Sequence, residues 1–319
     1  MTPNRAALAD VARRVFVSEG ISAAQLAGTA GEALLDSYLA IAGQALAAVQ
    51  AAPGRLIVLG LCGAQGSGKS TTARVVHDAL CELAGLSIVA LSLDDLYLSR
   101  AARAALARDV HPLFATRGVP GTHDVARGLA VIDSLAGADA ATVTCLPRFD
   151  KATDEPVEPG AEARVVGRPD VLVFEGWCVG ARPQPASALA EPVNELERVD
   201  DAQGRWRGHV NEQLDGPYRR LFHHIDRLVL LRAPRFECVV AWRQEQEHKL
   251  AARLRAAGAD TGASRVMSDA QVARFVMHYE RITRHVLEDM PAYADLLVEL
   301  DEARAVRAAV ARNPPRHLS

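Results

Sequence analysis

The feature that most constrains how this chain can fold is a glycine-rich turn at residues 63–70, Gly-Ala-Gln-Gly-Ser-Gly-Lys-Ser. It follows residues 56–61, a continuous apolar run of the kind found in strands buried on both faces of a parallel sheet. It precedes a helical pattern that runs from about residue 68 to residue 84. A buried strand, a glycine turn and a helix in this order open a βα unit, so we expect a parallel sheet.

The rest of the chain continues this alternation of strands and helices. Further apolar runs of strand length lie at residues 87–93, 171–174, 227–231 and 296–300. Helical patterns lie at residues 124–136, 235–256 and 269–288. The alternation predicts a doubly wound α/β fold with a parallel sheet of about five strands and an N-terminal helical extension. Together with the pattern G-x-x-x-x-G-K-S at residues 63–70, it indicates the P-loop NTPase class.

Two regions are expected, divided near residue 54. Residues 1–54 are rich in alanine, with helices predicted at residues 2–18, 22–27 and 31–49, and they end in Ala-Ala-Pro-Gly. Residues 55–319 would form the P-loop domain. It has one insertion at residues 148–168, predicted as a loop or small hairpin, and another at residues 180–207, with a short helix near 188–197. Long insertions in a compact domain often serve as lids or substrate loops.

Composition and charge argue against several classes of protein. A net charge of −3 disfavours a general nucleic-acid binder, which needs a basic surface. The five cysteines form no CxxC pair, which indicates reduced thiols and disfavours a structural zinc site. No continuous apolar run approaches the roughly 20 residues that span a bilayer, and Asp10 and Glu19 are unusual for an organelle transit peptide. We therefore expect a cytoplasmic protein with a small-molecule substrate and no nucleic-acid or membrane partner. The sequence predicts no oligomeric state.

The glycine turn matches the phosphate-binding pattern G-x-x-x-x-G-K-[ST]. In such loops backbone N–H groups surround a phosphate, glycines adopt positive φ angles, and the helix N-terminus adds partial positive charge. Lys69 can reach the β- and γ-phosphates of ATP, and the Ser70 hydroxyl can bind Mg²⁺. A chance match is the alternative, and the strand and helix on either side disfavour it. The residues predicted to bind the nucleotide are Gly63, Ala64, Gln65, Gly66, Ser67, Gly68, Lys69, Ser70 and Thr71.

Two acidic positions stand at the ends of predicted strands. Asp94 and Asp95 close the strand at residues 87–93, where a carboxylate would face the phosphates. Asp94 could accept the proton of an attacking hydroxyl, or both aspartates could cap the next helix, or each could do one of these jobs. Glu175 follows four apolar residues, which suits a water-mediated Mg²⁺ contact near Ser70. A solvated glutamate at a strand end is the alternative.

Three further segments could supply cations. Residues 117–124 and 146–151 are loops with basic side chains, which could bind a small anionic substrate or could simply be exposed. Arg243, on the helical pattern after the fourth strand, could reach over a transferring phosphoryl group, although arginines on helices are usually solvated.

Taken together, these motifs resemble D-glycerate 3-kinase of the plant and fungal type, a family similar to phosphoribulokinase, uridine kinase and bacterial pantothenate kinase. The resemblance extends from about residue 56 to residue 300, and segments 117–124 and 174–250 are its more specific part. The segments that carry it are residues 63–70, 92–97, 117–124, 146–151, 174–177 and 242–250.

The resemblance implies transfer of a phosphoryl group from ATP to D-glycerate, giving 3-phosphoglycerate. It implies a P-loop kinase domain at residues 55–319, with Asp94 as catalytic base and Lys69 and Arg243 stabilising the transferred group. Near the acceptor it implies Arg117, His123, Arg148 and Lys151. Two alternatives stay open: a kinase for another small acceptor, such as pantothenate, a nucleoside or a sugar acid, and a regulatory NTPase. A guanine-specific [NT]KxD motif would favour the second alternative and is absent from the sequence.

Overall fold

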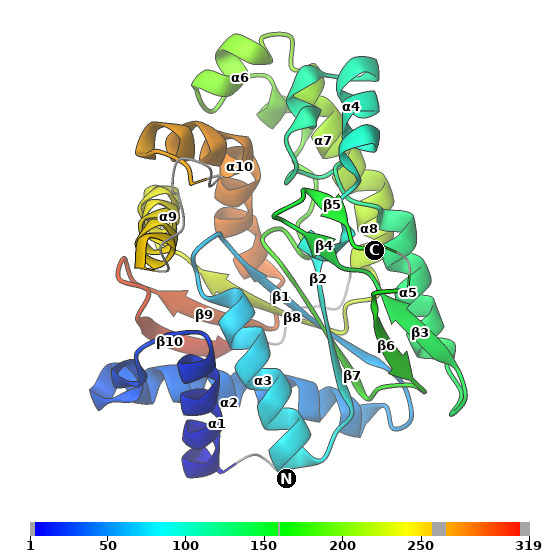
Figure 1. Cartoon of the computed structure of the whole chain (residues 1–319), viewed down its shortest axis with the longest axis vertical. Coiled ribbons are helices and arrows are strands. Elements are labelled where there is room, and N and C mark those ends of the chain that lie inside the picture. The colour runs from blue at the N-terminus through cyan, green and yellow to red at the C-terminus, as the bar shows by residue number, and fades with distance from the viewer. Residues whose placement is uncertain (1–3, 159, 257–265, 313–319) are drawn as a thin grey trace.

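A computed structural model describes residues 4–158, 160–256 and 266–312 of the chain, and its centre is a six-stranded sheet in the order β10-β9-β8-β1-β7-β2 (Figure 1). Five strands are parallel to one another: β1 (Ile57–Gly63), β2 (Ile88–Ser92), β7 (Val171–Gly176), β8 (Arg227–Arg232) and β9 (Leu296–Leu300). These are the five strands predicted from the sequence, and the α/β P-loop fold is confirmed. The sixth strand, β10 (Val306–Ala311), pairs antiparallel with β9 and was not predicted, because its alanine-rich sequence lacks the apolar run of a buried strand.

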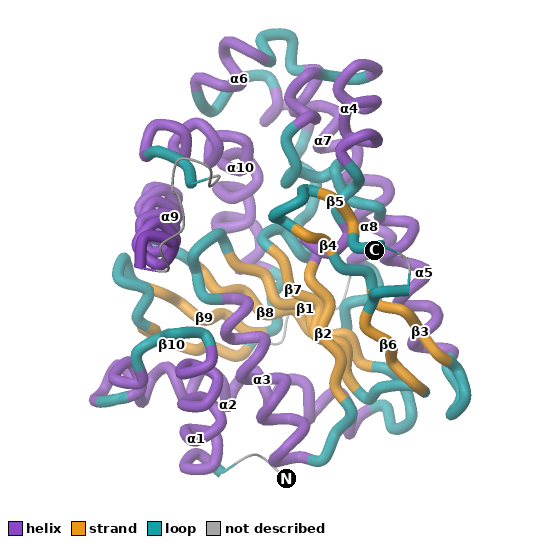
Figure 2. Tube along the Cα trace, viewed as in Figure 1, coloured by secondary structure: helices purple, strands orange, loops and turns teal. Residues whose placement is uncertain are grey.

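Helices cover both faces of the sheet, as expected for a doubly wound fold (Figure 2). Successive side chains of β1 point to opposite faces, so Leu59 and Leu61 belong to one hydrophobic cluster and Val58 and Cys62 to another. The first cluster includes side chains of α2 (Gly28–Ala51), α3 (Lys69–Ala84) and α9 (Phe236–Ala256). The second includes side chains of α5 (Val125–Gly137), α7 (Arg205–Gln213) and α8 (Arg219–Phe222).

The N-terminal segment packs directly on this core. Helix α1 (Arg5–Ser18) and the 3₁₀ helix Ala23–Leu26 precede α2, and α1 buries Val15 and Phe16 in a cluster shared with α2 and α3. The first predicted helix began at residue 2, and residues 1–3 lie outside the described residues. By length and composition, α2 is long and apolar enough to cross a membrane. The sequence analysis did not single out α2, because polar residues interrupt its apolar runs. Core helices of soluble proteins meet the same criterion, and one face of α2 packs against the sheet.

The insertions form small elements that add no strand to the central sheet. Residues 148–168 contain a short hairpin of β4 (Phe149–Asp150) and β5 (Glu155–Pro156), and then β6 (Ala163–Val166), which pairs with β3 (Val143–Leu146). In residues 180–207 a 3₁₀ helix, Ala186–Leu189, and α6 (Glu195–Asp200) stand where one helix was predicted near residues 188–197. Helix α4 (Arg100–Asp109) lies beside α7 at the top of Figure 1.

A buried ion pair joins the second insertion to α10 (Asp269–Asp289). Glu197 on α6 accepts hydrogen bonds from Arg281 Nε and Nη2 on α10 at 2.8 and 2.6 Å, and the side chains are 0% and 6% exposed. Arg281 also donates to the carbonyl oxygens of Ala188 and Glu191. Because these donors and acceptors are satisfied inside the protein, the pair fixes the position of α10 relative to the insertion.

Replacing Glu197 by alanine is expected to lower the free energy of unfolding by about 3–5 kcal/mol, because the Arg281 guanidinium would remain buried without its counter-charge. Urea denaturation followed by circular dichroism measures this. The control is Glu195→Ala, which removes an exposed partner of Arg198 and should change stability by less than about 1 kcal/mol. Equal losses of stability in the two variants would contradict a stabilising role for the Glu197–Arg281 pair.

Candidate active site

The glycine turn leaves β1 at Gly63 and enters α3 at Lys69. Gly66 and Gly68 have φ angles of +80° and +86°, in the left-handed region that favours glycine. A Cβ atom at residue 66 would also lie 2.6 Å from the Cβ of Trp242 on α9, so no larger residue fits there. The Ser67 hydroxyl is buried and finds no hydrogen-bond partner within the described parts of the chain. This loop therefore has the shape and the unused donor expected of a phosphate cradle.

A cavity of about 330 Å³ opens in front of the loop. It brings together the predicted residues Gln65, Gly66, Lys69, Ser70, Asp94, Arg117, Lys151, Glu175 and Arg243. Ser92, Tyr97, Gln246, Phe275 and Tyr279 complete its lining. Residues from seven separate segments of the sequence thus converge on one space, at the carboxyl edge of the parallel strands where ligands of such sheets bind.

The end of β7 holds an acid beside the loop. Ser70 Oγ donates a hydrogen bond of 3.0 Å to Glu175 Oε1, while Glu175 Oε2 is buried with no hydrogen-bond partner among described residues. A hydroxyl and a partly unused carboxylate suit a hard cation such as Mg²⁺, which takes oxygen ligands and keeps several waters. The described residues contain no group of three or more His, Cys, Asp or Glu that could hold a metal by themselves.

The sequence left open whether the two aspartates after β2 cap a helix or face the substrate, and the structure gives each of them a different set of contacts. Asp95 closes a capping box with Ser92 at the 3₁₀ helix Leu93–Leu96, and its carboxylate also accepts from Arg148 Nη1 at 2.7 Å. Asp94 instead points into the cavity, where it accepts hydrogen bonds from Lys151 Nζ at 2.6 Å and Tyr97 Oη at 2.9 Å. Asp95 therefore has a structural role, and Asp94 faces the space where a substrate would bind.

Asp94 is ionised at neutral pH. Burial would raise the pKa of its carboxyl, but the charges of Lys151 and Lys69 and the hydrogen bonds from Lys151 and Tyr97 outweigh burial and lower the pKa to about 2. Such a carboxylate is a good hydrogen-bond acceptor but a weak base. It can hold a hydroxyl group in a fixed orientation across the whole physiological pH range.

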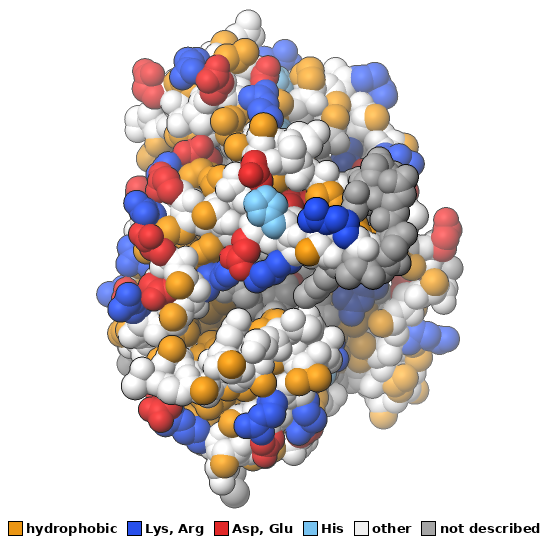
Figure 3. Space-filling model, turned by 60° about the vertical axis from the view of Figure 1, so that its left-hand side comes forward, with side chains coloured by type: hydrophobic (Ala, Val, Ile, Leu, Met, Phe, Trp, Pro, Cys, Tyr) orange, Lys and Arg blue, Asp and Glu red, His pale blue; other side chains and the backbone are white. Residues whose placement is uncertain are grey.

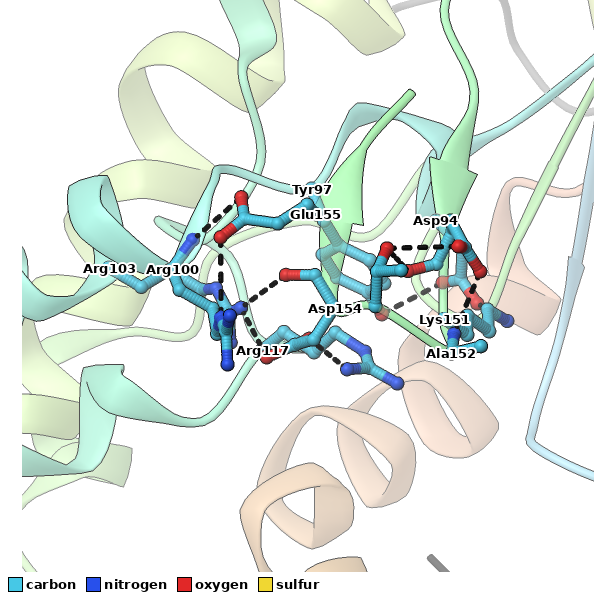
Figure 4. Close-up of polar contacts among 12 residues, drawn as sticks. Asp94, Tyr97, Arg100, Arg103, Arg117, Lys151, Ala152, Asp154 and Glu155 are labelled. Atoms are coloured by element: carbon cyan, nitrogen blue, oxygen red, sulfur yellow. Dashed lines mark hydrogen bonds and ion pairs between the residues drawn. The ribbon is translucent and has the colours of Figure 1, made fainter. Parts of the chain in front are cut away.

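Asp154 holds a second cation of the cavity lining, Arg117 (Figure 4). Asp154, in the turn between β4 and β5, forms ion pairs with Arg103 and Arg117. Arg103 is buried, and its remaining donors bind the carbonyl oxygens of Leu98 and Ala115, both at 3.1 Å. Arg117 lines the cavity and lies 5.5 Å from the centre of the Phe149 ring. Two guanidinium groups share one carboxylate, so the cluster keeps a net positive charge beside the cavity.

His123 and Arg148 do not line this cavity. His123 is buried behind Tyr97, with the two rings stacked 4.6 Å apart, and its Nδ1 lies 2.5 Å from Tyr218 Oη. Burial lowers the pKa of His123 to about 3, so the ring is neutral at physiological pH. Arg148 binds Asp95 and lines a neighbouring cavity. In this arrangement both residues support Tyr97 or Asp95 and neither contacts the space in front of the loop.

Arg243 reaches the cavity from α9, but it also has partners of its own. It pairs with the buried Glu247 one turn further along the helix and lies 6.0 Å from the ring centre of Phe275. Glu247 accepts a further hydrogen bond from the backbone N–H of Met267 at 3.1 Å. The guanidinium is therefore held at the cavity edge by a carboxylate that is itself fixed.

Known proteins that are similar to this chain are named as kinases. No protein-family model matches the chain. The uncharacterized kinase mug58 of Schizosaccharomyces pombe is 34% identical over 238 residues, which cover 71% of this chain and 79% of that protein. This chain belongs to the P-loop kinase family that includes D-glycerate 3-kinase. As in other such kinases, the reaction is a phosphoryl transfer that uses ATP.

Two relatives of this kinase are named as D-glycerate 3-kinases. The chloroplastic enzyme of Arabidopsis thaliana is 25% identical over 266 residues, which cover 81% of this chain but only 54% of the plant protein. The solved structure of the Cryptococcus neoformans enzyme is 25% identical with a TM-score of 0.69, and the match covers 86% of this chain and 99% of that one.

Sequence reasoning missed several residues around the cavity of this kinase. Tyr97 lies three residues after Asp94, the spacing of one 3₁₀ turn, and that spacing could have identified it as a partner. Asp154 carried no such signal, because its partners Arg103 and Arg117 lie 51 and 37 residues away in sequence.

Proposed function

We propose that this kinase transfers the γ-phosphoryl group of ATP to the 3-hydroxyl of D-glycerate, giving 3-phosphoglycerate and ADP. The observation that carries the proposal is that an acid, Asp94, and a cation, Arg117, line one small cavity. Asp94 can orient a hydroxyl, and Arg117, held by Asp154, can bind a carboxylate. A substrate with an acid at one end and a hydroxyl at the other matches that pair, and two relatives are named for this substrate.

In the proposed reaction the glycerate oxygen attacks the γ-phosphorus, and the bond to the oxygen bridging to the β-phosphate breaks. The hydroxyl proton passes to Asp94, and ADP leaves with the bond electrons. Because the transition state of phosphoryl transfer is loose, the proton is lost late, and a weak base suffices if it fixes the direction of attack. The low pKa of Asp94 therefore fits an orienting role better than strong proton abstraction.

The positive groups of the cavity have distinct proposed roles. Lys69 and Arg243 neutralise the charge that spreads over the transferred phosphoryl group. Lys151 keeps Asp94 ionised and stands close enough to contact the acceptor. Arg117 binds the glycerate carboxylate, since its planar guanidinium can donate two parallel hydrogen bonds to such a group.

Ser70 and Glu175 would hold Mg²⁺, with Glu175 acting through water. The bound ion would neutralise charge between the β- and γ-phosphates. The buried, unpaired Glu175 Oε2 and the Ser70 hydroxyl beside it support this assignment.

We place the reaction in the cytoplasm. All five cysteines are free, which fits a reducing compartment. The plant relative is named as chloroplastic, so the compartment can differ within the family.

An acceptor panel tests the proposed substrate. ADP release is measured with D-glycerate, L-glycerate, pantothenate, a nucleoside and a sugar acid, each with Mg·ATP. We expect turnover with D-glycerate, and a loss of about 100-fold or more in Asp94→Asn with ATP binding retained. Lys69→Ala should abolish turnover. Turnover with another acceptor and none with D-glycerate would refute the substrate while leaving the kinase activity intact.

Asp154→Asn is expected to raise the KM for D-glycerate about tenfold or more with a smaller change in kcat, because Arg117 loses the charge that orients it. Steady-state kinetics at fixed Mg·ATP measure this split. Asp150→Asn is the control: on the same hairpin Asp150 only accepts hydrogen bonds from Ala152 and Thr153 within its turn. A purely structural role for Asp154 would instead lower the melting temperature and kcat with KM unchanged.

Glu175→Gln is expected to raise the Mg²⁺ concentration needed for half-maximal turnover by about 10- to 100-fold. An uncharged amide would hold the water ligands of a divalent cation less strongly than a carboxylate does. Titration of turnover against Mg²⁺ at saturating ATP checks this. The matched control is Glu299→Gln, at the end of β9, where the glutamate pairs with Arg232 at the surface. An unchanged Mg²⁺ requirement would remove Glu175 from the metal site.

A further inference from the structure

A second cavity, of about 410 Å³, lies on the other side of the phosphate loop. Gly66 and Gln246 line both this cavity and the one at Asp94, so the two spaces meet at the loop. The second cavity continues over Thr71 and Thr72 at the start of α3. Its far wall comes from the N-terminal helices and from the turn between β9 and β10. Figure 3 views the molecule from the side of α9 and α10, and a groove crosses the middle of that face.

The direction of the triphosphate links this cavity to the nucleoside. If the γ-phosphate faces Asp94 and the other phosphates follow the loop amides, the α-phosphate would lie toward the first turn of α3. The nucleoside must then leave the loop on the side of Thr71. A third cavity borders Ser70, but Glu175 and Arg148 line it and it belongs to the metal side of the loop.

Beside the second cavity, the N-terminal segment forms hydrogen bonds with the first turn of α3. Thr71 Oγ1 donates a hydrogen bond of 2.6 Å to Glu19 Oε2, just after the end of α1. Tyr38 on α2 is buried, and its hydroxyl shares a hydrogen bond with the side chain of Thr72. The wall of the cavity is thus anchored to the phosphate loop by two adjacent residues, Thr71 and Thr72.

The chemistry of the lining suits a nucleoside. Ile21, Leu34 and Leu300 offer apolar surface for a flat ring, and the amides of Gln25 and Gln246 carry both donors and acceptors for the edge of a base. Glu19 precedes the lining residue Gly20, and its carboxylate, which already accepts a hydrogen bond from Thr71 at the edge of the cavity, could also accept one from a ribose hydroxyl.

The turn between β9 and β10 adds a constrained cation to the cavity wall. Arg304 has a φ angle of +69°, uncommon for a residue other than glycine, and it also lines the cavity. Its guanidinium pairs with Glu245 at 2.5 Å and lies 5.9 Å from the ring centre of Trp242, the residue that packs on Gly66. This contact ties the cavity wall to the phosphate loop a second time.

We propose that the N-terminal helical segment, residues 16–38, forms one wall of the site that binds the nucleoside of ATP. The base lies between Ile21 and Leu300, and the ribose lies near Glu19. This proposal rests on the proposed direction of phosphoryl transfer toward Asp94, and it assigns residues 16–38 a direct part in nucleotide binding.

The test compares two ligands that share the phosphates but not the nucleoside. Binding of Mg·ATP and of Mg·tripolyphosphate to the full chain is measured by calorimetry without an acceptor. Ile21→Trp, which fills the cavity, is expected to weaken ATP binding about tenfold or more and to leave tripolyphosphate binding within about twofold. The control is Val17→Trp, since Val17 is 67% exposed on the outer face of α1, and it should change neither affinity.

Unchanged ATP affinity in Ile21→Trp, or equal weakening of both ligands, would overturn the proposal. Gln25→Ala removes an exposed amide and provides the same comparison if Ile21→Trp does not fold. Because no acceptor is present, a failure of D-glycerate to react would not alter this result. Conversely, the binding result would leave the identity of the acceptor untouched.

Discussion

Parallel pairing of β7 with β1 and with β2 is the constraint on which the rest of the structure depends. Leu61 lies opposite Glu175 in one ladder, and Ser92 lies opposite Glu175 in the other. The glycine turn, the acid near the end of β7 and the aspartates after β2 are therefore neighbours before any loop contributes. Because both faces of these strands are buried, a slip of one residue would turn apolar side chains to the wrong layer. The hydrophobic core thus fixes the relative positions of the polar groups.

At the carboxyl ends of these strands, the charged side chains form small groups that differ in net charge. Lys151 and Asp94 balance one another, whereas Arg103 and Arg117 share the single charge of Asp154. The first group keeps a carboxylate ionised, and the second leaves positive charge beside the cavity. An anionic substrate would be attracted to Arg117 and would meet a hydrogen-bond acceptor, Asp94, in the same cavity. In the proposed reaction this difference orients the acceptor before any bond changes.

The sequence predicted the parts of the site that are local in the chain. The glycine turn lies between its strand and helix, and Glu175 follows four apolar residues at the end of β7, so pattern and position were enough to select them as candidates. What could not be predicted depends on contacts across long separations. Asp154 meets Arg117 only because the β4–β5 hairpin folds over the cavity, and His123 is buried because Tyr97 stacks on it. Strand β10 was missed for a related reason, since an edge strand needs no continuous apolar run.

The β4–β5 hairpin carries both Lys151 and Asp154, although its paired strands contain only two residues each. It pairs with itself and contributes no strand to the central sheet. Its turn can therefore vary in length and charge while the sheet, the phosphate loop and the Ser70–Glu175 contact keep their geometry. Kinases built on this sheet can diverge in the molecules they recognise by exchanging one short surface segment, so the ATP-binding parts of the fold can be inherited unchanged.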